Sequence, residues 1–171
     1  MPDAPSPIRP TDAEARDLAR RLIDTARFAA LAVRNPETGL PAISRIALGT
    51  DAEGCPVTLI STLSQHTAAL RADPQGAILV GEPASRGDPL THPRLSLDVR
   101  AEFVPRDAPD HAQLRTRWLS LQPKARLYVD FADFGFVRLV PESAALNGGF
   151  GRAYLLTPAD LMAKPRSGTD G

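Results

Sequence analysis

The chain begins with a proline-rich stretch and then changes to a helical pattern of apolar positions. Residues 1–10 contain four prolines and are expected to be disordered or extended. The following "TDAE" is typical of a capping box, in which Thr11 accepts a hydrogen bond from a backbone amide and Glu14 reaches back. The apolar residues that follow share one helical face: Ala15, Leu18, Ala19, Leu22, Ile23 and Ala26. This pattern predicts a helix from about Asp12 to Ala26.

Most of the next hundred residues form apolar or alternating runs of a length typical of strands. Gly, Pro, Asn and Asp separate the runs, and short connections between successive runs favour antiparallel pairing. We predict strands in "RFAALAVR" (27–34), "LPAISRIALG" (40–49), "CPVTLIST" (55–62), "GAILVGE" (76–82) and "RLSLDVRAEFVP" (94–105).

The remaining segments complete a mixed order of strands and helices. We predict a short helix within "STLSQHTAALRADPQ" (61–75), where Ser64 suits the N-cap position, and a longer helix over "APDHAQLRTRWLSLQ" (108–122). The run 125–146 is predicted to be extended, and "NGGFGRAYLL" (147–156) to be a glycine turn before a short strand. This order predicts a mainly β (α+β) fold, in which an antiparallel sheet closes into a barrel with helices at its edges.

Length and charge indicate one globular domain with few classes of partner. A chain of 171 residues can bury a full core, and we expect one domain over 11–161 and a polar tail over 162–171. Lys plus Arg and Asp plus Glu both number 20, so no overall charge attracts nucleic acid or an acidic membrane surface. No apolar run approaches the roughly 20 residues of a membrane helix, and the start lacks a signal-peptide pattern. We expect a cytoplasmic protein without nucleic-acid or membrane partners.

The residue types that most often bind metal ions are few and scattered. Cys55 is the only cysteine, and His66, His92 and His111 lie far apart. These spacings match no metal site, so we expect no bound metal ion. Cys55 fits the start of a strand better than the role of a nucleophile.

Arg45 is a charged residue within a predicted strand that is otherwise apolar or small. Its side chain must reach solvent or meet an anion, because burying an unpaired charge is costly. Strand alternation places Ile43, Arg45 and Ala47 on one face and Ser44, Ile46 and Leu48 on the other. Alternation alone does not decide which face is inside, so a solvated and an anion-binding Arg45 are both open.

Polar residues also gather between the third predicted strand and the short helix. They are Ser61, Thr62, Ser64, Gln65, His66 and Thr67. Hydroxyls and backbone amides at a helix start can hold a phosphate, but the same groups can simply cap the helix and face water. Further along, the glycines of "NGGFGR" (147–152) match neither a dinucleotide fingerprint nor a Walker loop. They can turn a hairpin or let the backbone approach a flat ligand.

In this order and spacing, "RFAALAV", "HTAALRADP", "GAILVGEP", "PRLSL" and "YVDFADFGFVRLVPESAALNGGFGRAYLL" resemble the pyridoxamine 5'-phosphate oxidase-like flavoproteins. They are most similar to the branch that includes the haem-utilisation proteins, and the resemblance covers Leu18 to Leu161. It implies a six-stranded antiparallel split β-barrel with flanking helices. It also implies a homodimer that binds FMN in two clefts at the dimer interface.

The resemblance further implies which residues bind the cofactor. The family's phosphate-binding positions fall on Arg45 with Ile46, Ile60 with Ser61, and His66 with Thr67. From the glycine turn, Asn147, Gly149 and Arg152 would pack near the cofactor. No acid, base or nucleophile stands out, so we assign no catalytic residue.

Several departures from the family pattern keep more than one function open. Thr50 replaces a lysine of the family, and His66 and Thr67 replace a basic pair. The Arg-x-His motif of true pyridoxamine phosphate oxidases is missing, and no histidine follows His111 to serve as the C-terminal iron ligand of haem-degrading relatives. We predict an FMN-binding flavoprotein that acts as a small-molecule oxidoreductase. The alternatives are a haem-binding or haem-degrading split-barrel protein and a non-catalytic flavin-binding dimer.

Overall fold

Runs of apolar residues form the strands of the sheet around which the protein is built. The computed structural model describes residues 7–162. Six strands have six residues or more: β2 (Phe28–Arg34), β3 (Pro41–Ala47), β5 (Pro56–Ser61), β6 (Gln75–Val80), β7 (Arg94–Phe103) and β8 (Phe134–Asn147). The short strands β1 (Ile8–Arg9), β4 (Gly49–Thr50) and β9 (Ala153–Leu156) extend the same sheet. The first five predicted strands are confirmed, with ends within two residues of those expected.

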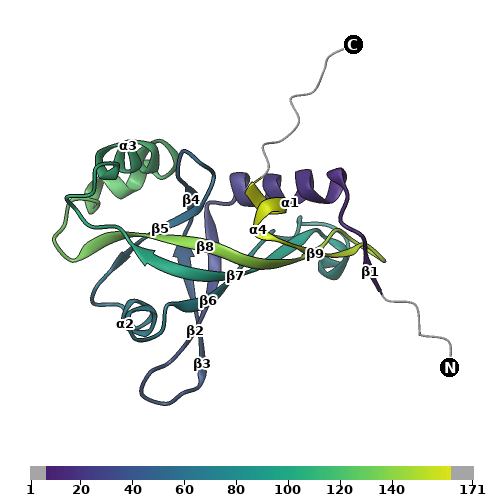
Figure 1. Cartoon of the computed structure of the whole chain (residues 1–171), viewed down its shortest axis with the longest axis horizontal. Helices are drawn as coiled ribbons and strands as arrows, with labels where there is room; N and C mark the ends of the chain where they lie inside the picture. The colour runs from purple at the N-terminus through teal and green to yellow at the C-terminus, as the bar shows by residue number, and fades with distance from the viewer. Residues whose placement is uncertain (1–6, 163–171) are drawn as a thin grey trace, which may run out of the picture.

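The long strands pair in the order β3-β2-β6-β7-β8-β5, and every pair among them is antiparallel (Figure 1). The predicted fold, a mainly β six-stranded antiparallel split β-barrel with flanking helices, is therefore confirmed. The expected closure of the barrel is wrong, because β3 and β5 form no ladder within residues 7–162. After β3 the chain turns into β4, which pairs with the start of β5 and occupies that edge. The Thr58 hydroxyl bridges the opening by donating to the Ala47 carbonyl at 2.7 Å.

The helices lie around the sheet, and three of them were predicted. These are α1 (Ala13–Thr25), α2 (Gln65–Ala72) and α3 (His111–Leu121). The apolar face of α1 packs on the main core as expected. The expected capping box is wrong, because Asp12 is the N-cap and its Oδ1 accepts from the Ala15 amide at 2.8 Å. Thr11 instead donates its hydroxyl to the Leu155 carbonyl, which ties the helix start to β9.

Other differences from the sequence prediction lie where pairing partners are distant in sequence. Ile8 and Arg9, in the range expected to be disordered or extended, pair in parallel with β9, and α4 (Pro158–Met162) packs beside α1. Residues 1–6 and 163–171 lie outside the described residues, so the predicted terminal segments stay predictions. The predicted extended run 125–146 is wrong in its first part. The short 3-10 helix η2 (Pro123–Leu127) and turns precede β8, and Arg106 donates to the carbonyls of Phe131 and Phe134 there.

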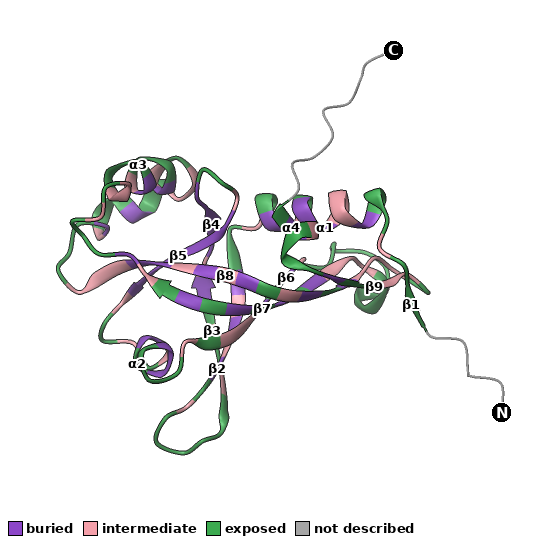
Figure 2. Ribbon diagram, viewed as in Figure 1, coloured by how far each residue is buried: buried purple, intermediate pink, exposed green. Residues whose placement is uncertain are grey.

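Two apolar clusters hold these elements together (Figure 2). The larger fills the barrel and includes Leu95, Leu97 and Val99, the inward residues of β7. The smaller joins α3 and η2 to the sheet, with Trp118 edge-on to Phe136 at 5.8 Å between ring centroids. Each fully buried side chain of this size contributes about 1.5–3 kcal/mol, so the second cluster fixes α3 firmly.

Within residues 7–162, none of the helices has both the length and the apolar character needed to cross a bilayer. The cytoplasmic location stays a prediction.

Candidate functional site

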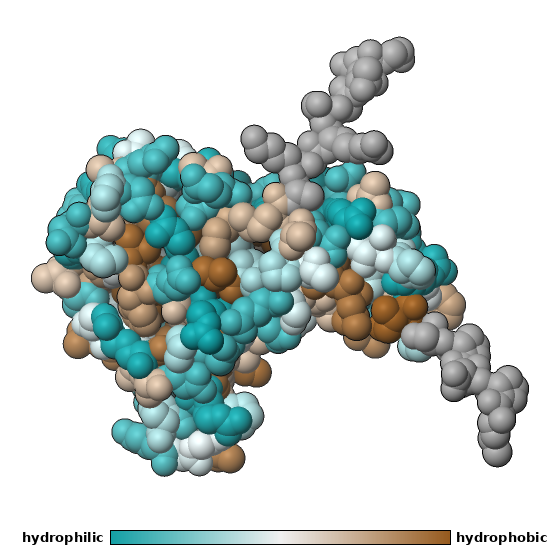
Figure 3. All heavy atoms as spheres, in the orientation of Figure 1, coloured by the Kyte–Doolittle hydropathy of each residue, from teal (hydrophilic) through white to brown (hydrophobic). Residues whose placement is uncertain are grey.

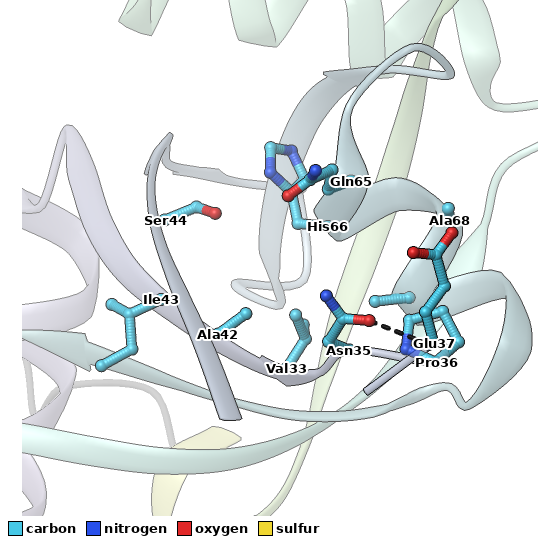
Figure 4. Close-up of a pocket in the computed structure, with 11 residues that line it drawn as sticks. Val33, Asn35, Pro36, Glu37, Ala42, Ile43, Ser44, Gln65, His66 and Ala68 are labelled. Carbon is cyan, nitrogen blue, oxygen red and sulfur yellow. Dashed lines mark hydrogen bonds between the residues drawn. The ribbon is translucent and has the colours of Figure 1, made fainter. Parts of the chain in front are cut away.

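A pocket of about 150 Å³ lies where α2 follows β5, the segment in which the sequence predicted a ligand cradle. It lies between the start of α2, strand β3 and the turn from β2 to β3. Figure 4 shows the side chains of Ser44 and His66 extending into the same space from β3 and α2. The lining residues are Val33, Asn35, Pro36, Glu37, Ala42, Ile43, Ser44, Gln65, His66, Ala68 and Ala69.

His66 is the predicted site residue that lines this pocket. The Nε2 atom of its half-buried ring is covered by protein and has no hydrogen-bond partner among the described residues. Burial lowers the pKa of His66 below its ordinary 6.5, because desolvation disfavours the charged ring. The imidazole is therefore mostly neutral near pH 7, with a ring nitrogen available as an acceptor or metal ligand.

The Ser61 hydroxyl, expected to bind a phosphate, is engaged within the chain. Its Oγ donates to Asp133 Oδ2 at 2.6 Å and accepts from the Leu63 amide at 3.1 Å. The Thr62 amide donates to the Asp133 carbonyl at 2.8 Å, which holds this acidic residue beside the end of β5. A carboxylate next to Ser61 repels an anion, so the local charge does not favour a phosphate there.

Thr67 and Ile60 also face the protein interior. The Thr67 side chain is buried, and its hydroxyl donates to the Ser61 carbonyl at 2.7 Å. This hydrogen bond ties the first turn of α2 to the end of β5. Ile60 belongs to the main core. These two residues position α2, and neither side chain lines the pocket.

Arg45 lies on the outer face of β3, whereas Ile46 is buried on the inner face. The guanidinium Cζ lies 5.3 Å from the Phe28 ring centroid, a cation–π contact. No ion pair joins Arg45 to a carboxylate of residues 7–162. Ser44 lines the pocket from the other face of the strand, so Arg45 and Ser44 point to opposite sides.

The glycine turn, which holds the remaining predicted site residues, lies at the far end of β8. Asn147 Oδ1 accepts from the Gly149 amide at 3.0 Å, and Gly149 has φ +115 with Thr91 close by, which excludes a larger residue. Arg152 pairs with Glu14 at the start of α1, and this hydrogen bond raises the pKa of Arg152. Phe150 and Leu155 are exposed near this turn, and Figure 3 shows apolar surface at the β1–β9 end.

The structure therefore separates the predicted site residues of one chain. Ser61, with the start of α2, and the glycine turn lie at opposite ends of β8, while Arg45 lies on β3 and faces away from the pocket. Ser61 pairs with Phe134 at the first position of β8, whereas Asn147 is the last residue of that 14-residue strand. Thirteen steps along a strand correspond to roughly 40 Å, which is too far for one cofactor to contact both groups. Sequence reasoning missed Ser44 and Asp133. Ser44 could have been found from its alternation with Arg45, but Asp133 has no local signal.

The described residues offer no metal centre of the usual kind. No group of three His, Cys, Asp or Glu side chains between residues 7 and 162 lies close enough together to hold an ion.

Known proteins resemble this chain in sequence and in fold. No profile of a known protein family matches the chain. The chain is 32% identical over 117 residues to "Non-canonical heme oxygenase HOZ, chloroplastic" of Arabidopsis thaliana, a match that covers 68% of this chain and 35% of that protein. A solved heme binding protein from Mycobacterium smegmatis is 28% identical, with a TM-score of 0.79 over 91% of this chain and 61% of its own.

A solved relative of general stress protein 26 from Clostridium acetobutylicum, of the pyridoxinephosphate oxidase family, is 14% identical. Its TM-score is 0.66 over 88% of this chain and 99% of its own, which shows a shared fold alone. The chain thus spans about a third of the plant relative (35%) and under two thirds of the mycobacterial protein (61%).

The antiparallel sheet with helices around it, and the pocket where α2 follows β5, place this chain in the class of split-barrel proteins. The chain belongs to the pyridoxamine 5'-phosphate oxidase-like split-barrel family, on its haem-utilisation branch.

Proposed function

We propose that this protein binds haem and breaks it down when a reductant and oxygen are supplied. One observation carries the proposal: apolar side chains cover the middle of the outer face of β2, β3 and β6, and Arg45 beside them forms no ion pair among the described residues. Cross-strand pairs put Arg45, Ala30 and Leu79 in one row and Ile43, Ala32 and Ala77 in the next. We call these six residues together with Phe28 the outer-face patch.

The composition of the outer-face patch fits a flat ligand with an anionic edge. The alanines form a shallow floor, while Phe28 (39% exposed), Ile43 (75%) and Leu79 (46%) stand around it. A haem ring is flat and largely apolar, and its propionates are anionic. The apolar residues would exclude water from the ring, and Arg45 would donate to a propionate. Bound haem would supply an iron centre for oxygen chemistry.

The named relatives support haem as the ligand. The plant protein is a haem oxygenase by name, and the mycobacterial one is a heme binding protein. Both are longer than this chain, so their activity comes to it only as part of the proposal.

An FMN-dependent oxidoreductase is the second candidate. The unpaired Arg45 and, on the other side of β3, the pocket at the start of α2 are each a possible place for the flavin phosphate, because a guanidinium and a helix start both suit an anion. The Ser61 and Thr67 hydroxyls count against it, because both are already hydrogen-bonded within the chain. A split-barrel dimer that holds flavin without turning it over is the non-catalytic form of this candidate.

We also propose that the protein works as a homodimer with its cofactor at the interface. Ser61 and the glycine turn lie at opposite ends of β8 in one chain. A second copy placed against the outer-face patch would bring other residues to the same ligand. The apolar patch supports such an arrangement, because exposed apolar surface of this kind marks interfaces.

Titration of the purified protein with haemin and, separately, with FMN tests the choice of cofactor. We expect a shifted and sharpened Soret band with haemin, bleached when ascorbate is added in air, and an unchanged flavin spectrum. An unchanged free-haemin spectrum would overturn the proposal. A changed flavin spectrum in that case would favour FMN, and bound flavin that neither NADH nor NADPH reduces would favour the non-catalytic dimer.

Arg45→Ala tests the carrying observation directly. We expect about tenfold or more loss of haemin affinity, because a charge-assisted contact contributes on the order of 1.5–3 kcal/mol. Arg100→Ala is the matched control, since Arg100 lies on the outer face of the same sheet but already pairs with Glu142 at 3.1 Å. Equal haemin affinities for the two variants would indicate that Arg45 is only a solvated strand residue.

A further inference from the structure

The pocket at the start of α2 contains uncharged hydrogen-bonding groups on the opposite side of β3 from the outer-face patch. Three of its lining side chains are Asn35, Ser44 and Gln65, and the half-buried ring of His66 lies beside them. Within residues 7–162, no hydrogen-bond partner engages the Ser44 hydroxyl or the Gln65 side-chain amide. These groups are therefore available to a ligand.

We infer that this pocket binds a single six-membered ring that carries a neutral amide. The site is additional to the outer-face patch, so the inference does not depend on haem binding. A protein cavity of about 150 Å³ holds one benzene-sized ring, and this pocket has a volume of about 150 Å³. Val33, Ala42 and Ala69 supply apolar walls for the ring, and the polar side chains between them select its substituent.

Asn35 determines which ligand atom can be bound beside it. Its Oδ1 already accepts from the backbone amides of Glu37 at 2.8 Å and Thr38 at 3.2 Å. These two hydrogen bonds orient the side chain and leave Nδ2 as a donor. Figure 4 shows this nitrogen turned away from Glu37. The ligand must therefore offer an acceptor, such as a carbonyl oxygen.

Gln65 and Ser44 suit the nitrogen of the same amide. Gln65 Oε1 and the Ser44 hydroxyl can accept a hydrogen bond, and an amide N–H can only donate. A primary amide can thus use the Asn35 donor and one of these acceptors together. The ring of His66 needs no rotation for this arrangement. Only its Nε2 is covered, so a ligand can meet the Nδ1 side of the ring as it stands.

The charges around the pocket favour a neutral ligand over an anion. In the described part of the chain, no Lys or Arg side chain lines the pocket. Burial lowers the pKa of His66, so its ring supplies no positive charge near pH 7. The exposed carboxylate of Glu37 also lines the pocket and disfavours a second negative charge. The start of α2 acts in the other direction, so a carboxylate is the probe to compare with an amide.

Titration of the haem-free protein with benzamide, benzoate and toluene tests the class of ligand. The three probes share one ring and differ in the attached group. We expect benzamide to shift the nuclear magnetic resonance signals of Ser44 and His66, with a Kd on the order of 1 mM. Benzoate and toluene should bind about tenfold or more weakly, because one adds a charge and the other leaves Asn35 Nδ2 without an acceptor. Equal or tighter binding of either, or no binding of benzamide, would overturn the inference.

Asn35→Asp tests the donor without removing the support of the turn. The variant keeps an oxygen for the Glu37 and Thr38 amides and replaces Nδ2 by a second oxygen. It should therefore bind benzamide about tenfold more weakly than the wild type. Unchanged affinity in the folded variant would contradict the assigned contact and overturn the inference.

Ala68→Leu tests the location. The larger side chain fills the pocket from α2 and should abolish benzamide binding. Ala72→Leu is the matched control, because Ala72 is also exposed on α2 but lies outside the pocket. Equal benzamide affinities of the two variants would place benzamide elsewhere and overturn the inference. A wild-type protein that binds benzamide in this way but not haemin would leave the inference standing and overturn the proposed function.

Discussion

At the scale of single residues, two adjacent residues of α2 have different environments, although the same role was expected of both. His66 and Thr67 were both expected to hold a phosphate, yet a helix turns by about 100° per residue. Thr67 is consequently buried against β5, while His66 lies in the pocket. Thr67 fixes where α2 begins, and His66 faces the space that this placement creates.

Thr67→Val should lower stability without changing cofactor affinity. The substitution keeps the shape but removes the hydroxyl that donates to Ser61, a loss of about 1 kcal/mol. The Ser64 amide still donates to the Ser61 carbonyl, so this carbonyl keeps a hydrogen-bond donor in the variant. Urea unfolding measures the first effect and haemin titration the second. Thr62→Val, at an exposed neighbour, should change neither. Normal stability with weakened binding would make Thr67 a ligand contact.

Stability should also depend on pH through His66. Its pKa is lowered in the folded protein because the ring is desolvated. Below pH 6.5 the unfolded chain therefore binds a proton that the folded protein resists, and stability falls as pH falls. The pKa values of Asp130 and Asp160 are also lowered, but they make stability depend on pH only in more acidic solution, below their ordinary value of 3.8. Urea unfolding at about pH 7.5 and about pH 5.5 should show a smaller loss for His66→Gln than for wild type. Equal losses would contradict a desolvated ring.

The chemistry of the candidate site was only partly predictable from single residues. The sequence placed His66 correctly at the start of a helix, and alternation offered two faces for Arg45. Burial of Ile46 decides that Arg45 faces outward. The engagement of Ser61 by Asp133 could not be foreseen, because 72 positions separate the two residues and only the β5–β8 pairing joins them.

At the scale of elements, the local pattern of apolar residues was sufficient to predict each strand or helix that has its own apolar face. β2 alternates buried and exposed side chains, and its limits followed from that alternation. α4 and β1 are too short for such a pattern and depend on distant partners. Arg20 donates to the Leu161 carbonyl at 3.0 Å, and Arg16 pairs with Asp160, so α1 holds α4 in place.

The connection after β6 provides a prediction at this scale. Gly81 has φ +102, and an added Cβ would lie 2.5 Å from the Pro93 carbonyl. Gly81→Ala should therefore cost about 3 kcal/mol or more in unfolding free energy. Gly39→Ala is the matched control, because Gly39 has φ +70 with nothing within 4 Å of the added atom, and should cost about 1 kcal/mol. Similar costs in thermal or urea unfolding would contradict the close approach at Gly81.

At the scale of the whole molecule, the predicted site residues of one chain lie far apart. The pocket at α2 and the glycine turn lie at opposite ends of β8, and the outer-face patch lies open on the sheet. The apolar pattern of one sequence does not indicate how two copies of the chain would pack together. The fold was thus predictable from local apolar periodicity, whereas the distances between the predicted site residues depend on strand pairing and were not predictable in this way.

Assembly can be measured independently of any cofactor. If a second copy covers the outer-face patch, light scattering at micromolar concentration should give twice the 18.3 kDa of one chain. Ile43→Asp or Leu79→Asp should shift the mass toward the monomer, because a carboxylate would be buried in an apolar interface. Leu127→Asp is the matched control: Leu127 is 79% exposed but lies on η2, beside α3 and away from the patch. A monomeric wild type, or an equal effect of all three substitutions, would rule out the patch as the dimer interface. A monomeric Ile43→Asp that also loses haemin binding would link assembly to the site, as expected if each chain alone holds only part of it.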